Sequence, residues 1–159
     1  MPTTPRVYLA GPDVFWPDAI QRGEHLKTLC RNAKLEGIYP LDSGVKLEGL
    51  RPFDQGCAIY QANVELIRTC SAILANMTPF RGPSMDVGTA FEMGYGASRK
   101  LLIAGYTANM VEYKTRTAPD GLLIEEFGMI DNLMVHGATG DAIFTTVEEA
   151  IFFLAEHLL

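Results

Sequence analysis

The chain has 159 residues, of which 48% are hydrophobic and 20% are charged, and its formal net charge is −6. This length and composition predict one globular domain over residues 1–159 with a hydrophobic core of its own. An acidic chain without a Lys/Arg run lacks the positive surface of proteins that bind nucleic acids or membranes. We therefore expect neither kind of partner.

The cysteines and histidines give no pattern typical of a metal site. Cys30, Cys57 and Cys70 fit neither a zinc spacing nor a CxxC motif, and the three histidines are scattered. We expect reduced thiols and no bound metal. The first residues lack the pattern of a signal peptide, and no apolar run approaches the length of a transmembrane helix. The expected location is the cytoplasm.

Short apolar runs alternate with longer helical patterns in the first half of the chain. Residues 6–10 predict a strand, and residues 17–34 predict a helix whose first turn suits its leading proline. A second, short strand is expected at 37–40. A loop rich in Gly and Asp follows at 42–52, and apolar residues at helical spacing predict the next helix at 53–69.

The same alternation continues through the middle of the chain. Residues 71–75 form a continuous apolar run, as expected of a central strand that is buried on both faces. A helix is expected at 86–99 and a fourth strand at 100–105. These elements follow one another with few intervening residues.

The C-terminal third has weaker patterns. Residues 106–120 are polar and irregular, residues 122–127 predict a short helix, and residues 131–137 indicate a loop or a subunit contact. A fifth strand is expected at 141–144. The closing helix at 146–159 begins with a threonine suited to an N-cap, and two glutamates follow it at the positive end of the helix dipole.

Alternating strands and helices predict an α/β protein with a parallel sheet. Right-handed crossovers then give a flavodoxin-like, doubly wound sandwich, with a five-stranded, mostly parallel sheet and helices on both faces. Such folds bind ligands beyond the carboxyl ends of their strands. Functional residues are therefore expected in the segments that follow each strand.

The segment after the first strand combines a glycine, a carboxylate and aromatic rings. Gly11 permits close approach of the backbone to a ligand. Asp13 can anchor a polar group, and Phe15 and Trp16 offer surfaces for a flat base. A turn whose aromatic residues fill the core explains the same residues equally well. The segment matches neither a dinucleotide-binding loop nor a phosphate loop.

The segment after the third strand is the most informative part of the chain. Asp86 lies near the amino end of the expected helix, where a cap role is also reasonable. Glu92 lies about two turns deeper among apolar and small residues, where burying a carboxylate is costly unless it is paired. Gly88, Gly94 and Gly96 each weaken the helix by roughly 1 kcal/mol relative to Ala, which indicates close packing or ligand access. These residues alone leave Glu92 equally explained as a functional or a surface residue.

Other polar positions carry little signal by themselves. Asn63 lies on the helix at 53–69, where an isolated Asn is more often a solvated residue. Asn132 and Met134 lie in the segment that indicates a loop or a subunit contact.

Taken together, these segments resemble the nucleoside 2-deoxyribosyltransferase family. The run at 86–95 reads Asp-x-Gly-x-x-x-Glu-x-Gly-Tyr and matches the acidic motif of the family. The opening Tyr-Leu-Ala-Gly at 8–11 and the Asn-Leu-Met at 132–134 match in the family's order. The similarity extends over nearly the whole chain.

The resemblance implies an enzyme that transfers a 2-deoxyribosyl group between nucleobases and needs no cofactor. Glu92 matches the nucleophile, Tyr8 matches the tyrosine that orients it, and Asp86 matches the aspartate that holds deoxyribose hydroxyls. Asn132 and Met134 match residues that reach into the active site of a neighbouring subunit. A homo-oligomer, either a dimer or a hexamer, is therefore implied.

One departure from the family concerns the nucleobase. Many members carry an aspartate that faces the base and is proposed to pass it a proton, whereas Asn63 occupies the matching position here. An amide can form hydrogen bonds to a base but is a poor general acid near neutral pH. The resemblance therefore leaves the proton donor unidentified.

The family mechanism would be a double displacement. A covalent glycosyl-glutamate forms first, and the acceptor base then attacks C1′, which gives net retention, with some hydrolysis when water replaces the base. One alternative is a 2′-deoxynucleoside 5′-monophosphate N-glycosidase, although the acidic and aromatic segment at 11–16 should repel a phosphate. A further alternative is a non-catalytic nucleotide-binding module, which would not need Glu92.

Overall fold

Five parallel strands form a single sheet in the computed structural model, which describes residues 4–159. The strand order is β2-β1-β3-β4-β5, so the chain starts one strand in from an edge, adds β2 on that edge and then adds the other strands on the opposite side of β1. The strands are β1 (Arg6–Ala10), β2 (Glu36–Ile38), β3 (Ala72–Asn76), β4 (Leu102–Tyr106) and β5 (Ile143–Phe144). The predicted α/β sandwich is confirmed, and its sheet is parallel throughout.

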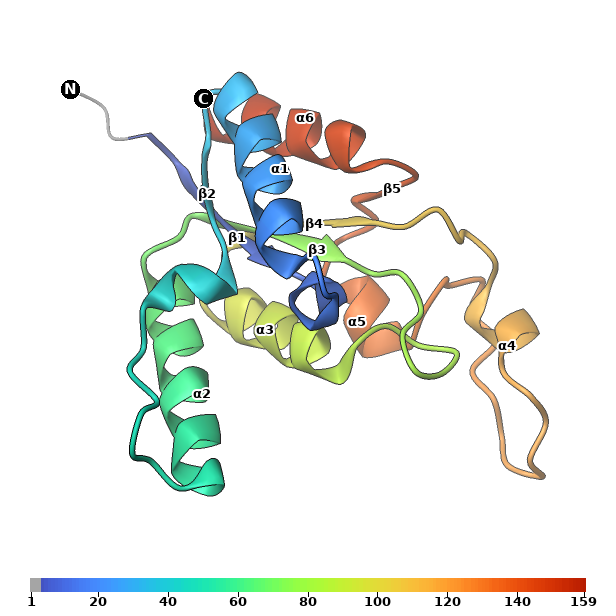
Figure 1. The fold of residues 1–159 in the computed structure, drawn as a ribbon. Helices are drawn as coiled ribbons and strands as arrows, with labels where there is room; N and C mark the ends of the chain where they lie inside the picture. Colours follow the sequence, from blue (N-terminus) through green and yellow to red (C-terminus); the bar gives the residue numbers. More distant parts are fainter. Residues whose placement is uncertain (1–3) are drawn as a thin grey trace.

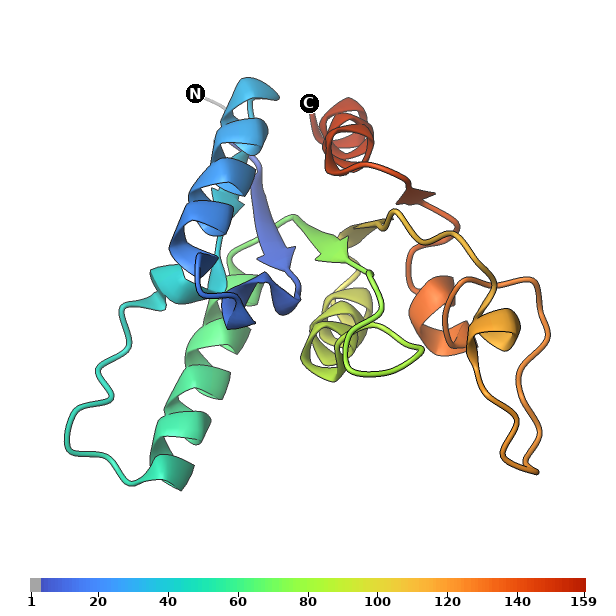
Figure 2. The same ribbon diagram turned by 45° about the vertical axis from the view of Figure 1, so that its right-hand side comes forward.

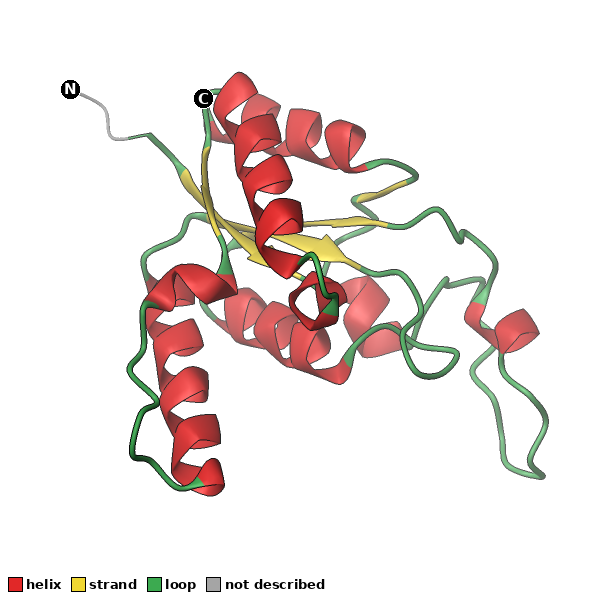
Figure 3. Ribbon diagram, viewed as in Figure 1, coloured by secondary structure: helices red, strands yellow, loops and turns green. Residues whose placement is uncertain are grey.

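Helices cover both faces of this sheet, as Figure 1 and Figure 3 show. One face packs against α1 and α6, and the other packs against α2, α3 and α5. The helices are α1 (Ala19–Asn32), α2 (Pro52–Arg68), α3 (Val87–Ser98), α4 (Tyr113–Arg116), α5 (Leu133–Gly137) and α6 (Val147–Leu158), with 3-10 turns η1 (Pro12–Phe15) and η2 (Pro40–Ser43).

The strand β1, which has a neighbour on each side, sends alternate side chains to the two faces of the sheet, as every strand does. Val7 and Leu9 join the hydrophobic cluster under α1 and α6. Tyr8 and Ala10 join the cluster under α2 and α3. This alternation therefore decides that the Tyr8 hydroxyl points toward α3.

Most predicted elements lie within three residues of their observed bounds, but the C-terminal third differs. The helix predicted at 122–127 is wrong, because this segment is an extended loop in which Leu123 is 99% exposed. Gly121 and Gly128 flank it with φ values of 87° and 69°, and its apolar residues Leu122 and Phe127 are also exposed. Figure 2 shows this region projecting from the body of the molecule. The segment at 131–137 contains a short helix, α5, and Thr146 caps α6 as predicted.

Three features of the described residues bear on binding. Within residues 4–159, no three His, Cys, Asp or Glu side chains form a group that could hold a metal ion. None of the helices in this part of the chain is both long and apolar enough to cross a membrane. Cys30, Cys57 and Cys70 are free thiols. The first three residues of the polar N-terminal segment lie outside the described residues.

Candidate active site

The fold brings Tyr8 and Glu92 together although they are 84 positions apart in sequence. The Tyr8 hydroxyl donates a 2.7 Å hydrogen bond to Oε1 of Glu92. Tyr8 is fully buried on strand β1. Glu92 lies in the second turn of α3, which packs on that strand. A rigid strand thus orients one carboxylate oxygen and leaves the other free.

The surroundings of Glu92 move its ionisation into the neutral range. Burial raises the pKa of Glu92 to about 7, the Tyr8 hydrogen bond acts in the opposite direction, and the nearby Asp86 charge raises the pKa further. Burial and the Glu92 charge also raise the pKa of Tyr8, so its hydroxyl stays protonated and remains a donor. Near neutral pH, the site therefore holds an ionised carboxylate in part of the molecules.

A cavity of about 280 Å³ opens between α2 and α3 beside this pair. Its walls are mainly apolar, and Glu92 and Asn63 contribute polar groups, which is typical of a small-molecule site. The aromatic rings of Tyr60 and Phe91 lie 5.9 Å apart along it. The lining residues are Tyr60, Asn63, Val64, Ile67, Gly88, Phe91 and Glu92.

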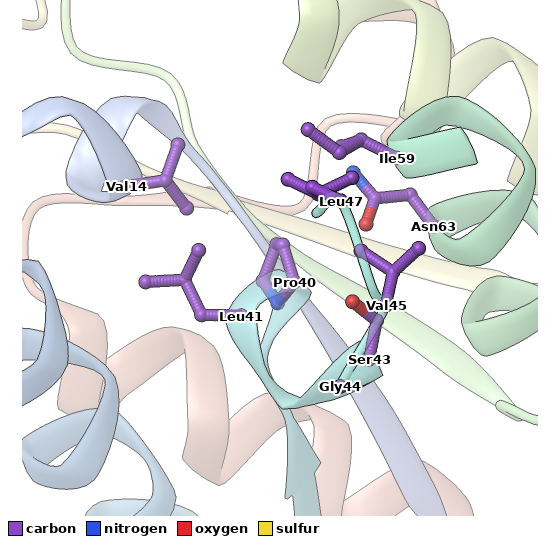
Figure 4. Close-up of a pocket in the computed structure, with 9 residues that line it drawn as sticks. All are labelled: Val14, Pro40, Leu41, Ser43, Gly44, Val45, Leu47, Ile59 and Asn63. Carbon is purple, nitrogen blue, oxygen red and sulfur yellow. The ribbon is translucent and has the colours of Figure 1, made fainter. Parts of the chain in front are cut away.

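A second cavity, of about 290 Å³, adjoins the first and shares Asn63 with it. Figure 4 shows Val14 from η1, Pro40 and Leu41 from η2, and Ile59 and Asn63 from α2 around it. The turns η1 and η2 follow β1 and β2, so this cavity lies where the fold predicts ligands to bind. It is almost entirely apolar, apart from Asn63 and Ser43.

Asn63 lies between the two cavities with an unsatisfied acceptor. Its Oδ1 atom is buried and has no hydrogen-bond partner among the described residues. Asn63 as a whole is half-buried, so the interpretation as a solvated helix residue fails for this oxygen atom alone. Buried polar atoms are rarely left unpaired, so a donor on a ligand would satisfy this one.

Asp86 caps α3, as the sequence predicts. Its Oδ2 accepts hydrogen bonds from the backbone N–H of Thr89 at 2.9 Å and from the Thr89 hydroxyl at 3.0 Å. The cap places this carboxylate near Glu92, since the Asp86 charge acts on the Glu92 pKa. The other Asp86 oxygen forms no hydrogen bond within residues 4–159, and a ligand contact for it stays a prediction.

Gly11 and Asp13 join the end of β1 to the end of β3. Asp13 is 7% exposed and accepts hydrogen bonds from Nδ2 of Asn76 at 2.8 Å and from Nη1 of Arg22 at 3.3 Å. A Cβ atom on Gly11 would lie 2.8 Å from Cβ of Asn76. The close approach that requires glycine is thus an approach to the protein itself, and a ligand contact for either residue stays a prediction.

The aromatic residues after β1 lie at the surface rather than in the core. Phe15 is 56% exposed and stacks on Phe80, with ring centroids 5.5 Å apart. The Arg81 guanidinium lies over both rings. Trp16 is 50% exposed and carries the Arg22 guanidinium 4.6 Å above its ring. The interpretation of these rings as core filling is wrong, and a ligand contact for Phe15 stays a prediction.

Asn132 and Met134 lie away from the cavities of their own chain. Asn132 caps α5: its Oδ1 accepts from the Met134 N–H at 3.0 Å, and its Nδ2 donates to Glu125 Oε1 at 2.7 Å. Met134 is 74% exposed. Figures 1 and 2 show α5 on the opposite side of α3 from α2, whereas both α2 and α3 line the cavity beside Glu92.

The sequence reasoning missed three residues. Asn76 ends a buried strand at its carboxyl end, so a signal for it was present in the sequence. Tyr60 lines the cavity beside Glu92, but an aromatic residue on a helix is typical of a core and gives no signal of a site. Asp131 was passed over within an apparent loop, although it is 1% exposed.

These features define a class of protein: a doubly wound α/β fold with a hydrogen-bonded Tyr–Glu pair beside a small-molecule cavity. The family model for nucleoside 2-deoxyribosyltransferases matches residues 7–134. The chain therefore belongs to the nucleoside 2-deoxyribosyltransferase family.

Known proteins agree with this assignment. The chain is 31% identical to a 2-desoxiribosyltransferase from Leishmania mexicana, whose structure superposes with a TM-score of 0.80 over 98% of this chain and 99% of that one. It is also 31% identical to an uncharacterized protein, C191.05c, from Schizosaccharomyces pombe, over 84% of this chain and 76% of that protein.

A more distant structure shares the fold alone. A 2-deoxyribosyltransferase from Bacillus psychrosaccharolyticus is 15% identical and superposes with a TM-score of 0.60, over 92% of this chain and 90% of that one.

Proposed function

We propose that this enzyme transfers the 2-deoxyribosyl group between nucleobases of 2′-deoxynucleosides, with Glu92 as the nucleophile. The observation that carries the proposal is the Tyr8–Glu92 pair at the edge of a cavity, in a chain of this family. The 31% identity to the Leishmania 2-desoxiribosyltransferase over nearly the full length supports the same reaction.

The first step breaks the bond between C1′ and the donor base. The ionised Glu92 carboxylate attacks C1′, the electron pair of the glycosidic bond goes to the base nitrogen, and a glycosyl ester forms. The acceptor base then attacks C1′ from the opposite face and releases the carboxylate. Two inversions give net retention, and water in place of the acceptor gives hydrolysis.

Tyr8 and Asp86 prepare the sugar side of the site. Tyr8 occupies Oε1 of Glu92, which leaves Oε2 for C1′. Thr89 occupies Oδ2 of Asp86, which leaves Oδ1 to accept a hydrogen bond from a deoxyribose hydroxyl. In both Glu92 and Asp86, one carboxylate oxygen is thus hydrogen-bonded within the protein, and the other is available to the substrate.

The nucleobase occupies the second cavity, with Asn63 at its junction with the first. The buried Oδ1 of Asn63 accepts a hydrogen bond from the base, but an amide cannot protonate the leaving group near neutral pH. Gly11, Asp13 and Phe15 belong to the turn after β1 that contributes Val14 to this cavity, and we assign them to the base end of the site on that ground.

A neighbouring subunit completes the site through Asn132 and Met134. This is supported by their position across α3 from the cavity of their own chain and by the exposure of Met134. The enzyme is therefore proposed to work as a homo-oligomer, a dimer or a hexamer, without a metal or organic cofactor. We place it in nucleoside salvage in the cytoplasm, since an exposed free thiol such as Cys57 persists in a reducing compartment.

A three-arm assay tests the reaction. The protein is incubated with deoxyinosine and adenine, with deoxyinosine alone, and with a deoxynucleoside 5′-monophosphate. Formation of deoxyadenosine in the first arm is expected, with slower release of free hypoxanthine in the second. Cleavage of the monophosphate alone would replace the proposal by the N-glycosidase. Arg22 forms an ion pair with Asp13, so the turn after β1 repels a phosphate less strongly than its sequence indicates.

A further inference from the structure

We propose that Asp131 is a positioning residue that serves two active sites at once, that of its own chain and that of a neighbour. The inference rests on the proposed function, which places Asn132 in the neighbouring site. Its basis is the set of hydrogen bonds that the buried Asp131 carboxylate makes to two separate segments of the chain.

Asp131 is 1% exposed, and both of its oxygens are used. Oδ2 accepts a hydrogen bond from the backbone N–H of Met85 at 2.9 Å. Oδ1 accepts from the Ser84 hydroxyl and, at 2.8 Å, from the backbone N–H of Asn132. A buried carboxylate is costly unless it is hydrogen-bonded, so these three bonds hold it in place.

One end of this arrangement determines where α3 begins. Met85 is 2% exposed and packs in the same hydrophobic cluster as Tyr8. It directly precedes Asp86, the N-cap of the helix that carries Glu92. The bond from Met85 N–H to Asp131 therefore fixes the start of the helix that presents both carboxylates of the chain's own site.

The other end determines where α5 begins. Asn132 is the N-cap of α5, and its backbone N–H shares Oδ1 of Asp131 with Ser84. The orientation of the Asn132 side chain and of the following Met134 thus depends on the same carboxylate. Both are the residues proposed to enter the neighbour's site.

Arg116 forms a second bridge between the same two segments. Its guanidinium donates to the carbonyl oxygens of Pro83 and Ile130, the residues just before Ser84 and Asp131. It is anchored by a third bond, from Nε to the Val111 carbonyl at 3.0 Å. These two bridges join residues 83–86 to residues 130–134. The position of Glu92 in the chain's own site is therefore coupled to the position of Asn132 in the neighbour's site.

Mixed oligomers test this dual role. Two chains are co-expressed with different tags and purified over both: one carries Glu92→Ala and supplies Asn132, and the other carries Asn132→Ala and supplies Glu92. Only a site that takes Glu92 from one chain and Asn132 from the other is complete, whatever the size of the oligomer. Deoxyribosyl transfer by this mixture, above that of either parent, establishes the baseline.

Asp131→Asn is then added to one chain at a time. We expect it to lower kcat/KM roughly tenfold or more from either chain, because an amide mismatches at least one of the three donors. A loss from only one of the two chains overturns the dual role, as does no loss from either. Asp120→Asn, an exposed aspartate whose side chain accepts only from the Leu122 N–H within residues 4–159, is the matched control and should have no effect from either chain.

Two further outcomes separate the inference from the function on which it rests. If the baseline mixture is no more active than its parents, the proposed contribution of Asn132 to a neighbour fails, and the dual role of Asp131 fails with it. If Asp131→Asn does not fold, Arg116→Lys applies the same test through the second bridge. A loss confined to one chain again overturns the inference.

Discussion

The two faces of the sheet are built from the same strands but are covered differently. On one face, α1 and α6 close over Val7 and Leu9 to form a continuous hydrophobic layer. On the other, α2 and α3 cover Tyr8 but leave a cavity between them, and they bury the Glu92 carboxylate. A one-residue step along β1 therefore separates the stabilising face from the face that carries the proposed site, called the reactive face below.

The helix α3 shows how the reactive face combines packing with access. At Gly96 the helix lies so close to β3 that a Cβ atom would be 2.3 Å from Cδ1 of Ile73. Near its other end, Gly88 lines the cavity instead. Glycine thus permits contact with the sheet at one end and space for a ligand at the other. The contrast between the faces leads to four predictions.

The largest expected effect is that of Glu92→Ala on the reactive face. Removing the nucleophile should lower kcat for transfer by about a thousandfold or more, because no other group replaces the covalent step. Steady-state transfer from deoxyinosine to adenine measures it, with circular dichroism to verify folding. Glu156→Ala, an exposed glutamate on α6, is the control and should keep full activity. Substantial transfer by the Glu92 variant would refute the mechanism.

The opposite face should respond in stability alone. Leu154 on α6 is fully buried, so Leu154→Ala should lower the free energy of unfolding by about 2–5 kcal/mol. Urea unfolding measures the loss. At a temperature where the variant is folded, kcat/KM should equal that of the wild type, and a clear fall would mean that the two faces are not separate in function.

Tyr8→Phe should alter the pH dependence of the reaction as well as its rate. The hydrogen bond from Tyr8 stabilises the ionised carboxylate, so its loss should raise the pKa of Glu92 above about 7. The rise of kcat/KM with pH should then shift to higher pH, and the rate at neutral pH should fall about tenfold to a hundredfold. An unshifted profile would show that Tyr8 does not tune the nucleophile.

The smallest expected effect is that of replacing the lysine after one helix on each face of the sheet by glycine. Lys34 follows α1 and Lys100 follows α3, and both have a φ of 61°, a conformation that favours glycine. Lys34→Gly and Lys100→Gly should each stabilise the protein by about 1 kcal/mol or less. Thermal unfolding measures the gain, and transfer activity should be unchanged. A loss of activity in only the second variant would show that the end of α3 also shapes the site.

The sequence was most informative where local patterns decide the structure. The apolar run of β3, the helical spacing of α2 and the alternation of strands and helices predicted the layers, and the family motif predicted the Tyr8–Glu92 pair. Expectations failed where tertiary contacts decide. Three of the apolar residues at 122–127, Leu122, Leu123 and Phe127, are exposed, so the segment has little surface to cover as a helix. Asn63 shares a cavity with residues of η2, a neighbour that no local pattern reveals.

The position of Tyr8 also constrains how the protein folds. The strand that carries it is synthesised well before its sheet neighbour β3 and its partner Glu92, which lie more than sixty residues further along the chain. Such distant contacts form late, because a long loop must close before they contribute. A nascent chain that has not yet extended beyond α3 must therefore leave the Tyr8 hydroxyl without its partner, and the site can form only after α3 has been made.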